Sequence, residues 1–576
     1  MPIKNEILQA FEDHKEYLSC SNVKIVPYGM RCKYVTSTKT CVNMGNLINY
    51  LIFIECGLGV QNSTQELLAI IALSLLCVVY LLIVAIVADK YFSPALKSIA
   101  KSLRMNEHTT GVTLLAFGNT ISDLSSNLSS NSQSLIFTSS LASALFAMLV
   151  TGGLICYLYP SQLAKYSTLR DILFFIFGIM LVEYLFATET EVSVWTSIGI
   201  LSIYFVYLGI TIADGYLQRD DDNKTLVILN TKSHFTRLSQ RSSSNTKSLN
   251  NKSKSNVRLL PRRSLMATTS RMTQTSVNET ATRTADYKVD NPKNLNLVDD
   301  FFLAIQPIDE EVWVNSNGPL RIFLILVSPL VLICQLLIPV FNVEHARHGW
   351  SKLLNCIHIV IAPLFPTMAL FIKYTPWQAL MVLITVPLAL LAFFRSRTDV
   401  PPRFHVIYLF VGGFGSMFMI YHCTIEMTEA MKVVGMFLGL SEGFIAATIS
   451  CWGTSLSTLV TNLTLAAHGY SAMAFAACYG GPFFSFIIST GLSMTLHSMQ
   501  LREENMEKTS FGANAYVFLI GTLTSTLIWS LSYDFYGRRS IGIFNFVLYL
   551  IFVLYCVLCE NEIIHSYTKD KIFSVV

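Results

Sequence analysis

The sequence predicts an all-α membrane protein that crosses the lipid bilayer many times, and three observations support this fold class. The 576 residues are 52% hydrophobic and only 14% charged, whereas soluble domains carry roughly a quarter charged residues. The mean hydropathy of the chain is +0.50. Apolar runs recur at about the 20 residues that a helix needs to cross a hydrocarbon core of about 30 Å. Lipid is therefore the expected main solvent of the protein.

About thirteen apolar segments are candidates for membrane helices. In chain order they are Leu67–Ala88, Gly111–Ser130, Leu135–Tyr157, Ile172–Ala187, Val192–Ala213, Pro319–Phe341, Leu353–Ile372, Trp377–Phe394, Phe404–Tyr421, Met431–Ala467, Ala472–Leu496, Ala513–Ser532 and Ile541–Cys559. Of these, Met431–Ala467 is too long for a single crossing.

Residues 1–66 precede the first apolar segment and form an extramembrane region. Its four cysteines are Cys20, Cys32, Cys41 and Cys56. Four cysteines in one polar region indicate two disulfides, in three possible connectivities, and hence an oxidising compartment. Free thiols or a metal site are the alternatives, although no CxxC spacing supports zinc.

A polar segment over residues 214–318 is strongly basic. In its central part, residues 223–285, twelve Lys or Arg stand against a single acid, Glu279. This composition is typical of a disordered loop, and the positive-inside rule places it in the cytosol and the cysteine-bearing region outside. Two preceding arginines make Ser264 a candidate phosphorylation site. The net charge of the whole chain is only +4, which argues against nucleic acid as a partner.

Two related motifs lie about 335 residues apart, each inside an apolar segment. Phe117–Leu124 (FGNTISDL) matches Trp452–Leu459 (WGTSLSTL), and Thr113 and Thr448 occupy equivalent places five residues before each glycine. Such a repetition is typical of a duplicated transporter. Packing of helices through small residues is the alternative explanation of either motif alone.

The composition of the motifs suits a cation site. Glycine and hydroxyl residues loosen the helical hydrogen bonding, and the oxygens that they supply are ligands for Ca²⁺ or Na⁺ rather than for soft metals. Asp123 adds a negative charge. Because a carboxylate at the centre of a bilayer costs about 2.5 kcal/mol or more, its presence there indicates a function.

The sequence resembles the cation/calcium exchanger superfamily in two places. The first alpha-repeat of that family, with its GNGAPD core, is similar to Gly111–Ser126 (GVTLLAFGNTISDLSS). The second, with its GNSIGD core and a downstream A-C-F-G-G-P, is similar to Cys451–Phe484 (CWGTSLSTLVTNLTLAAHGYSAMAFAACYGGPFF). The spacing of the N-terminal cysteines is similar to that of the mitochondrial-type sodium/lithium/calcium exchanger branch.

This resemblance implies two five-helix repeats that are inserted in opposite orientations, with the motifs meeting at mid-membrane. The halves would be residues 67–213, with the first alpha-repeat at about 111–155, and 404–562, with the second at about 446–496. The region 319–394 would intervene, and 563–576 would form a C-terminal tail. If the two halves are inserted in opposite orientations, the chain must cross the membrane an even number of times between them. Three apolar runs lie there. Either one of these runs is re-entrant or interfacial, or the orientation assigned to one of the halves is wrong.

The resemblance also implies which residues bind the ions. They are Asn119, Thr120, Ser122 and Asp123 in the first repeat and Thr454, Ser455, Thr458 and Asn462 in the second. Glu426 matches an acid that precedes the second repeat. Glu183, inside the fourth apolar segment, is a further candidate acid that cavity lining or helix pairing would explain. In the second repeat the family's Asn falls on Thr454 and its two Asp fall on Thr458 and Asn462, so the acids are missing there.

The function that these features predict is secondary antiport of Ca²⁺ against Na⁺, Li⁺ or H⁺ by alternating access. The cations are cargo, so no cofactor is expected, and the expected partners are inorganic cations and the lipid bilayer. Because Asp123 is the one certain carboxylate of the predicted site, we expect weak Ca²⁺ affinity or an altered ratio of exchanged ions. A non-transporting regulatory homologue and an antiporter of another cation are the alternatives. An enzyme is not predicted. The plasma membrane or an endomembrane and the mitochondrial inner membrane stay open as locations.

Overall fold

The computed structural model describes residues 20–217, 293–499 and 510–565. Within these ranges the gaps are 43–44, 46, 104, 130–132, 189–192, 295, 309–312, 315, 341–348 and 371–374. Most of the basic segment, including Ser264, and most of the C-terminal tail lie outside the described residues.

The first half of the protein is a series of helices, several of which are joined end to end. They are α5 (Ser63–Val87), α6 (Ser93–Leu103), α7 (Glu107–Thr110), α8 (Ala116–Ser129), α9 (Gln133–Leu145), α10 (Gly152–Leu158), α11 (Lys165–Thr188) and a helix over Val194–Leu217. The π-helical turns Ala88–Phe92, Gly111–Leu115 and Phe146–Thr151 join α5 to α6, α7 to α8 and α9 to α10 without a break.

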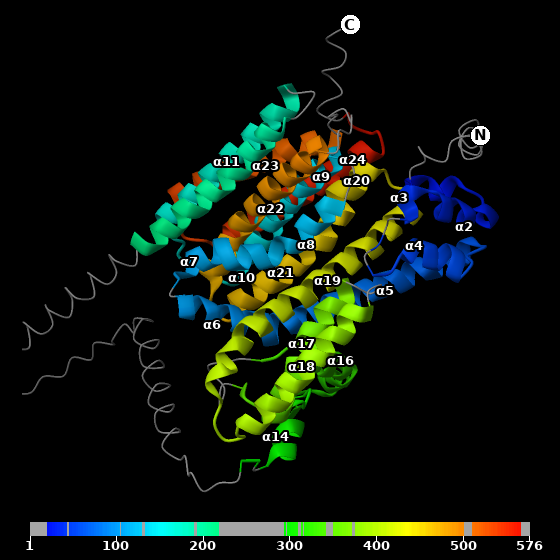
Figure 1. Cartoon of the computed structure of the whole chain (residues 1–576). Helices are drawn as coiled ribbons and strands as arrows, with labels where there is room; N and C mark the ends of the chain where they lie inside the picture. Colours follow the sequence, from blue (N-terminus) through cyan, green and yellow to red (C-terminus); the bar gives the residue numbers. More distant parts are fainter. Residues whose placement is uncertain are drawn as a thin grey trace, which may run out of the picture.

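The second half has the same plan. It comprises α19 (Ile407–Leu438), α20 (Glu442–Ile445), α21 (Cys451–Ala467), α22 (Ser471–Met499), α23 (Ser510–Ser532) and α24 (Arg539–Glu560), with a π-helical turn at Ala446–Ser450 between α20 and α21. Between the halves lie α14 (Leu297–Ala304), α16 (Gly318–Leu337), α17 (Lys352–Leu370) and α18 (Thr375–Arg395). Figure 1 shows α16, α17 and α18 together at one edge of the bundle, beside α19.

The all-α polytopic fold is confirmed, although some segments begin and end at other residues than expected. Among the described residues, ten helices are long and apolar enough to cross a membrane. The largest difference concerns α19, which runs unbroken through the predicted gap between Phe404–Tyr421 and Met431–Ala467. Residues 422–430 of α19 are polar enough to interrupt the hydropathy signal, but all nine are buried by neighbouring helices.

The real break lies at Gly439, where the backbone is left-handed (φ +77°) and ends α19. Such a conformation suits glycine at a helix C-terminus. The hydroxyl of Ser441 then caps α20 by accepting from the Phe444 N–H at 3.2 Å. Residues 439–443 match the letters GxSxG of a nucleophile elbow, but Ser441 follows a helix rather than a strand and its hydroxyl donates to Glu560.

Contacts at the two ends of the bundle show that the halves are inverted. Lys24 Nζ, in the N-terminal region that precedes α5, donates to the Leu438 carbonyl at 2.9 Å, so α19 ends where α5 begins. At the other end, Asp89, just past α5, lies 3.5 Å from the ring of His468, just past α21. Following the orientation that the basic residues predict, we name these the outer and the inner end.

The intervening helices indicate whether the chain crosses the membrane an even or an odd number of times between the two halves. The Trp350 ring donates to the Arg397 carbonyl at 2.9 Å, so α17 and α18 are antiparallel and return the chain to the side from which it came. At the inner end, the Asn106 amide contacts the Gly215 carbonyl, and Gly413 packs on α6. The chain therefore leaves the first half and joins the second at the inner end, so α16 adds no net crossing. These contacts favour the alternative in which one of the three apolar runs is re-entrant or interfacial.

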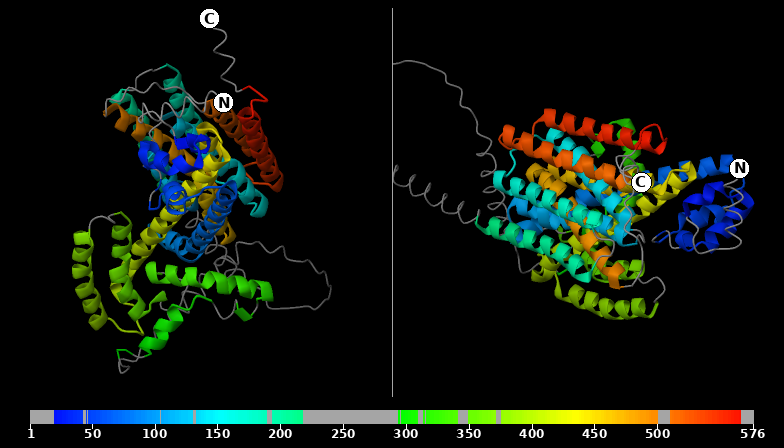
Figure 2. Two further views of the ribbon diagram at one scale, coloured as in Figure 1. Left: turned by 90° about the vertical axis from the view of Figure 1, so that its right-hand side faces the viewer. Right: turned by 90° about the horizontal axis from the view of Figure 1, so that it is seen from above.

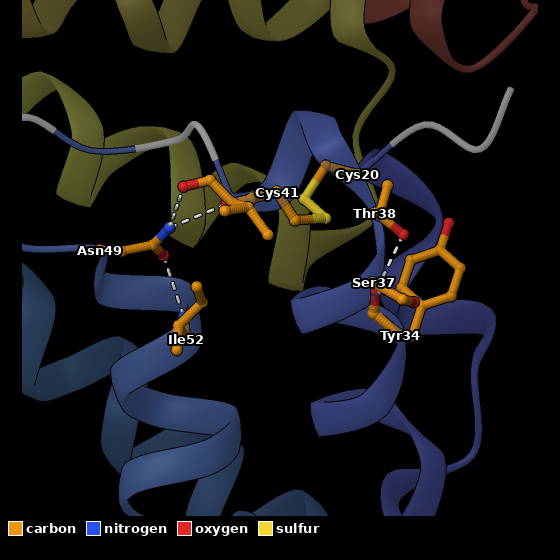
Figure 3. Close-up of a disulfide and its surroundings, with 8 residues drawn as sticks. Cys20, Tyr34, Ser37, Thr38, Cys41, Asn49 and Ile52 are labelled. Carbon is orange, nitrogen blue, oxygen red and sulfur yellow. Dashed lines mark hydrogen bonds between the residues drawn. A yellow bond between two sulfur atoms is a disulfide. The ribbon is translucent and has the colours of Figure 1, made fainter. Parts of the chain in front are cut away.

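The N-terminal residues 20–57, here called the disulfide domain, fold as short helices at the outer end. They include Cys20–Ile25, α2 (Tyr28–Ser37), α3 (Lys39–Val42) and α4 (Tyr50–Ile52). Disulfides join Cys20 to Cys41 and Cys32 to Cys56. Figure 3 shows the first of these beside Asn49, whose side chain donates to the Cys41 carbonyl and accepts from the Ile52 N–H.

The disulfide domain is attached to both halves of the bundle. Its hydrophobic cluster includes Ala69 of α5 and Val433 of α19. Arg31, 3% exposed, forms ion pairs with Glu55 at 3.5 Å and with Glu66 of α5 at 3.1 Å. Figure 2 shows the domain at one end of the molecule, against the ends of α5 and α19.

Candidate functional site

A π-helical turn precedes each of the two motifs. Thr113 lies in the turn before α8 and Thr448 in the turn before α21. Each threonine hydroxyl donates to a carbonyl four residues earlier, at 2.6 Å and 2.7 Å. Both effects interrupt the regular α-helical ladder at equivalent places in the two halves, as π turns often do at functional sites.

The helices α8 and α21 are joined through Asn119. The Asn119 amide nitrogen donates to the Asn462 side-chain oxygen at 2.7 Å, and the Asn119 side-chain oxygen accepts from the Thr461 hydroxyl at 2.8 Å. The Thr458 hydroxyl donates to the Asn119 carbonyl at 3.4 Å. All four residues are buried. Two segments about 340 residues apart in the sequence thus form one polar junction inside the bundle.

Asp123 lies next to this junction and faces the other motif. It is 8% exposed, and its carboxylate lies beside the Thr454 hydroxyl. Thr454 is in turn 3.5 Å from the Ser143 hydroxyl of α9. A carboxylate and several hydroxyls from three helices therefore converge, which is the donor chemistry that hard cations prefer.

The other predicted ligands lie on the same two helices but are engaged in different ways. The Thr120 hydroxyl donates to the Ala116 carbonyl of its own helix at 2.7 Å. Ser122 and Ser455 are fully buried between helices. The structure therefore brings Asn119, Asp123, Thr454, Thr458 and Asn462 into one cluster and places Thr120, Ser122 and Ser455 around it.

The two additional candidate acids lie on helices other than α8 and α21. The carboxylate of Glu426 accepts from the Leu47 N–H at 2.7 Å and from the Tyr50 hydroxyl at 2.8 Å, both in the disulfide domain. The same Tyr50 hydroxyl is 3.0 Å from the Tyr80 hydroxyl of α5. Glu426 is thus a docking point for the disulfide domain. Glu183 lies on α11, which packs on α22 and α23.

Sequence reasoning missed several polar residues of this region. Thr461 contributes directly to the junction, and Ser143 reaches it from α9. Asn127, one turn after Asp123, donates to the hydroxyls of Ser140 and Ser489. Each is a buried polar residue in an apolar segment, and that property could have identified it, because such groups need partners.

Close helix packing holds the junction together. A Cβ added to Gly453 would lie 2.7 Å from the Thr428 hydroxyl and 2.9 Å from the Thr428 Cα. A Cβ on Gly111 would lie 2.3 Å from the Met473 carbonyl oxygen. Glycine at these positions lets α21 approach α19, and lets the turn before α8 approach α22.

The donor set suits a transported cation rather than a tightly held metal. In the part of the chain that the structure describes, no group of three or more His, Cys, Asp or Glu residues is placed to hold a metal ion. The junction instead offers one carboxylate among amides and hydroxyls. Neutral oxygens bind hard cations weakly enough to release them, as transport requires.

Comparison with known proteins agrees with this architecture. The family model described as "Sodium/calcium exchanger protein" matches residues 73–213 and 408–558, just over half of the chain. The mitochondrial sodium/calcium exchanger proteins of Rattus norvegicus and Homo sapiens are each 26% identical, over 93% and 95% of this chain and 88% and 91% of theirs. Cation/calcium exchanger 1 of Arabidopsis thaliana is 25% identical over 89% of this chain and 84% of its own. A structure of the sodium-calcium exchanger NCX_Mj aligns with 84% of this chain and 98% of its own, at 12% identity and a TM-score of 0.39.

Proposed function

Because the chain belongs to the sodium/calcium exchanger protein family, we propose that it is a secondary antiporter that exchanges Ca²⁺ for Na⁺, with Li⁺ or H⁺ as other counter-ions. The observation that supports this most is the convergence of α8 and α21 on Asp123 and the Asn119 junction. These are also the two helices that carry the related motifs.

Charge balance predicts how the ions bind. Asp123 alone carries a negative charge in the cluster, since Thr458 and Asn462 stand where the family has acids, and Glu426 is bonded to the disulfide domain. A Ca²⁺ ion beside one carboxylate keeps a net positive charge, which is costly away from water. We therefore expect weaker Ca²⁺ binding, or a different Na⁺ to Ca²⁺ ratio, than in acid-paired relatives.

Alternating access fits the inverted halves. A site between two oppositely oriented repeats opens to one side or the other as the repeats move against each other. The long helices α5 and α19 are antiparallel and in contact over much of their length. Ions that compete for one site then exchange without a further energy source.

The test is flux of radioactive Ca²⁺ into liposomes that contain the purified chain, under gradients of Na⁺, Li⁺ or H⁺. Asp123→Asn should abolish gradient-dependent uptake, because it removes the charge and keeps the size of the side chain. Asp534→Asn, at an exposed ion pair with Lys165 at the inner end, is the matched control and should transport normally. Uptake by Asp123→Asn equal to wild type would refute the proposed site.

A non-transporting homologue is the second candidate, and one observation favours it. The Asn119 and Asn462 side chains bond to each other, and Thr458 bonds to the Asn119 backbone, so the polar groups of the junction satisfy one another without an ion. A protein of this kind would show no ion-dependent flux in the same liposomes. It would still bind its partners in the membrane.

A further inference from the structure

A large apolar cavity lies outside the cation site, between α19 and the α17–α18 pair. Its volume is about 1090 Å³, at the upper end of the usual range of small-molecule pockets, roughly 300–1,000 Å³. The walls are almost entirely aliphatic and aromatic side chains, among them Ile359, Leu388, Phe410 and Phe414. Leu388, Phe410 and Phe414 are also exposed on the outside of the bundle, so the cavity is continuous with the surface that faces lipid.

The arginine that lines the cavity lies at its inner end. Arg395, the last residue of α18, lines the cavity there and is exposed, and Arg403 immediately precedes the lining residue Phe404. The neighbouring Arg397, by contrast, is paired with Asp399. The N–H of Thr398 donates to the carbonyl of Lys293, where the chain returns from the basic segment, so this end is the one that the positive-inside rule predicts to be cytosolic.

A buried histidine at the same end has an unused hydrogen-bonding atom. His358 is 1% exposed and lines the cavity. Its Nε2 bonds to the Gln335 carbonyl at 2.9 Å, so this nitrogen carries the proton and Nδ1 is an acceptor. Nδ1 has no partner among the described residues. Because this atom is closed off from the space in the cavity, His358 is a fixed part of the wall, held by its bond to Gln335.

We propose that this cavity binds an anionic phospholipid of the inner leaflet. The phosphate lies at Arg395, with Arg403 beside the same end of the cavity, and one acyl chain fills the apolar part. The cytosolic leaflet carries anionic lipids, and basic pockets between membrane helices on that side suit their headgroups. The stretch from Phe404, just before α19, to Tyr421 of α19 rises about 25 Å, which exceeds the roughly 15 Å of one hydrocarbon leaflet.

The far end of the cavity touches the helix that carries Asp123. Ile121, Leu124 and Ser125 of α8 line it, and the Ser125 hydroxyl is 2.7 Å from the Tyr421 hydroxyl of α19. A lipid chain in the cavity therefore packs against the face of α8 opposite the cation junction. Binding itself does not depend on transport, so it can be measured whether or not the chain exchanges ions.

The test is photolabelling of the full chain in phosphatidylcholine-containing micelles. Two probes with the same diazirine-bearing acyl chain are compared, one phosphatidylserine and one phosphatidylcholine. The phosphatidylserine probe should label α17–α19 saturably and be displaced by unlabelled phosphatidylserine. Arg395→Gln with Arg403→Gln should weaken labelling about thirtyfold, since each arginine near a lipid surface contributes roughly a fivefold factor. Arg538→Gln, an exposed arginine elsewhere at the inner end, should have no effect.

A second pair of variants tests the apolar part. Ala362→Trp fills the cavity and should suppress labelling, whereas Leu383→Trp, on the exposed face of α18 outside the lining, should not. Gly415→Leu fills the opposite wall and replaces Ala362→Trp if that variant does not fold. Equal labelling by the two probes would show an unspecific hydrophobic groove and overturn the proposal. So would labelling that is unchanged by the arginine substitutions or by a filled cavity.

Discussion

The bond between Asn119 and Asn462 allows the joining of the two halves to be measured directly. Asn119→Ala removes the donor to Asn462 and the acceptor of the Thr461 hydroxyl. Thr461 keeps alternative acceptors in the Ser457 and Thr458 carbonyls, at 3.0 Å and 3.1 Å. The Asn462 oxygen, in a residue that is 0% exposed, is instead left without its donor.

The expected cost follows from this difference. One buried acceptor without a partner costs about 1–3 kcal/mol, and hydrogen bonds between membrane helices lie at the lower end, on average about 0.6 kcal/mol. Asn119→Ala should therefore lower the free energy of unfolding by about 1–2 kcal/mol. Thr461→Val should cost about as much, because it leaves the buried Asn119 side-chain oxygen without its donor, although the Asn119–Asn462 bond stays intact.

A double-mutant cycle with Asn462→Ala isolates the pair. Unfolding is followed in mixed micelles by titration with a denaturing detergent, for wild type, both single variants and the double variant. We expect a coupling energy of about 1 kcal/mol. Effects that simply add, within about 0.3–0.5 kcal/mol, would show that the two side chains do not interact and would refute this part of the structure.

Three further predictions concern other contacts. Glu426→Gln should weaken the attachment of the disulfide domain to the bundle by about 1–3 kcal/mol, because an amide cannot accept from both the Leu47 N–H and the Tyr50 hydroxyl. Limited proteolysis of the domain should then become faster. Gly453→Ala should lower the free energy of unfolding by about 1–3 kcal/mol and so lower the melting temperature, because the added methyl group overpacks the contact with α19. Gly209→Ala should not, because a methyl group at Gly209 meets no atom within 4 Å. Arg31→Met should cost about 3–5 kcal/mol by leaving a buried carboxylate without its partner, with part of this recovered at mildly acidic pH. Burial raises the pKa of Glu55, so stability is gained as the pH falls through that raised pKa and is lost above it.

Each of these predictions has an outcome that contradicts it. Glu426→Gln that alters ion affinity and leaves proteolysis of the domain unchanged would restore Glu426 as an ion ligand. Equal melting temperatures for the two glycine variants would show that α21 and α19 are less closely packed than described. An Arg31→Met protein whose stability does not depend on pH would mean that the remaining carboxylates reach water.

The motif pair was predictable from the sequence because its residues are unusual for a membrane segment. An acid, amides and hydroxyls at matching positions indicate a polar junction without any knowledge of the fold. Asn119 was identified on this basis and Asn462 through the family resemblance, and the structure places them in contact. Thr461 was not, since a threonine in an apolar helix commonly bonds to its own backbone, and only the approach of α8 gives it a second acceptor.

Hydropathy failed where neighbouring helices replace lipid. Residues 422–430 were read as a gap because they are polar, but they lie inside the bundle, where burial against other helices stabilises them. Which of the three apolar runs between the halves does not cross could not be chosen from the sequence, because composition does not record direction in the membrane. The role of Glu426 was equally hidden, because its partner Leu47 is 379 residues away and donates through its backbone.

The π-helical turns before α8 and α21 let each motif tolerate a one-residue change in chain length at these places. A π turn holds one residue more than the α-helix that would replace it, and each residue turns an α-helix by about 100°. Deleting Thr113 would therefore let the turn relax to regular geometry, with Asp123 still facing Thr454. A one-residue deletion in α8 between this turn and Asp123 has no extra residue to give up, so it would rotate Asp123 by about 100°, away from Thr454.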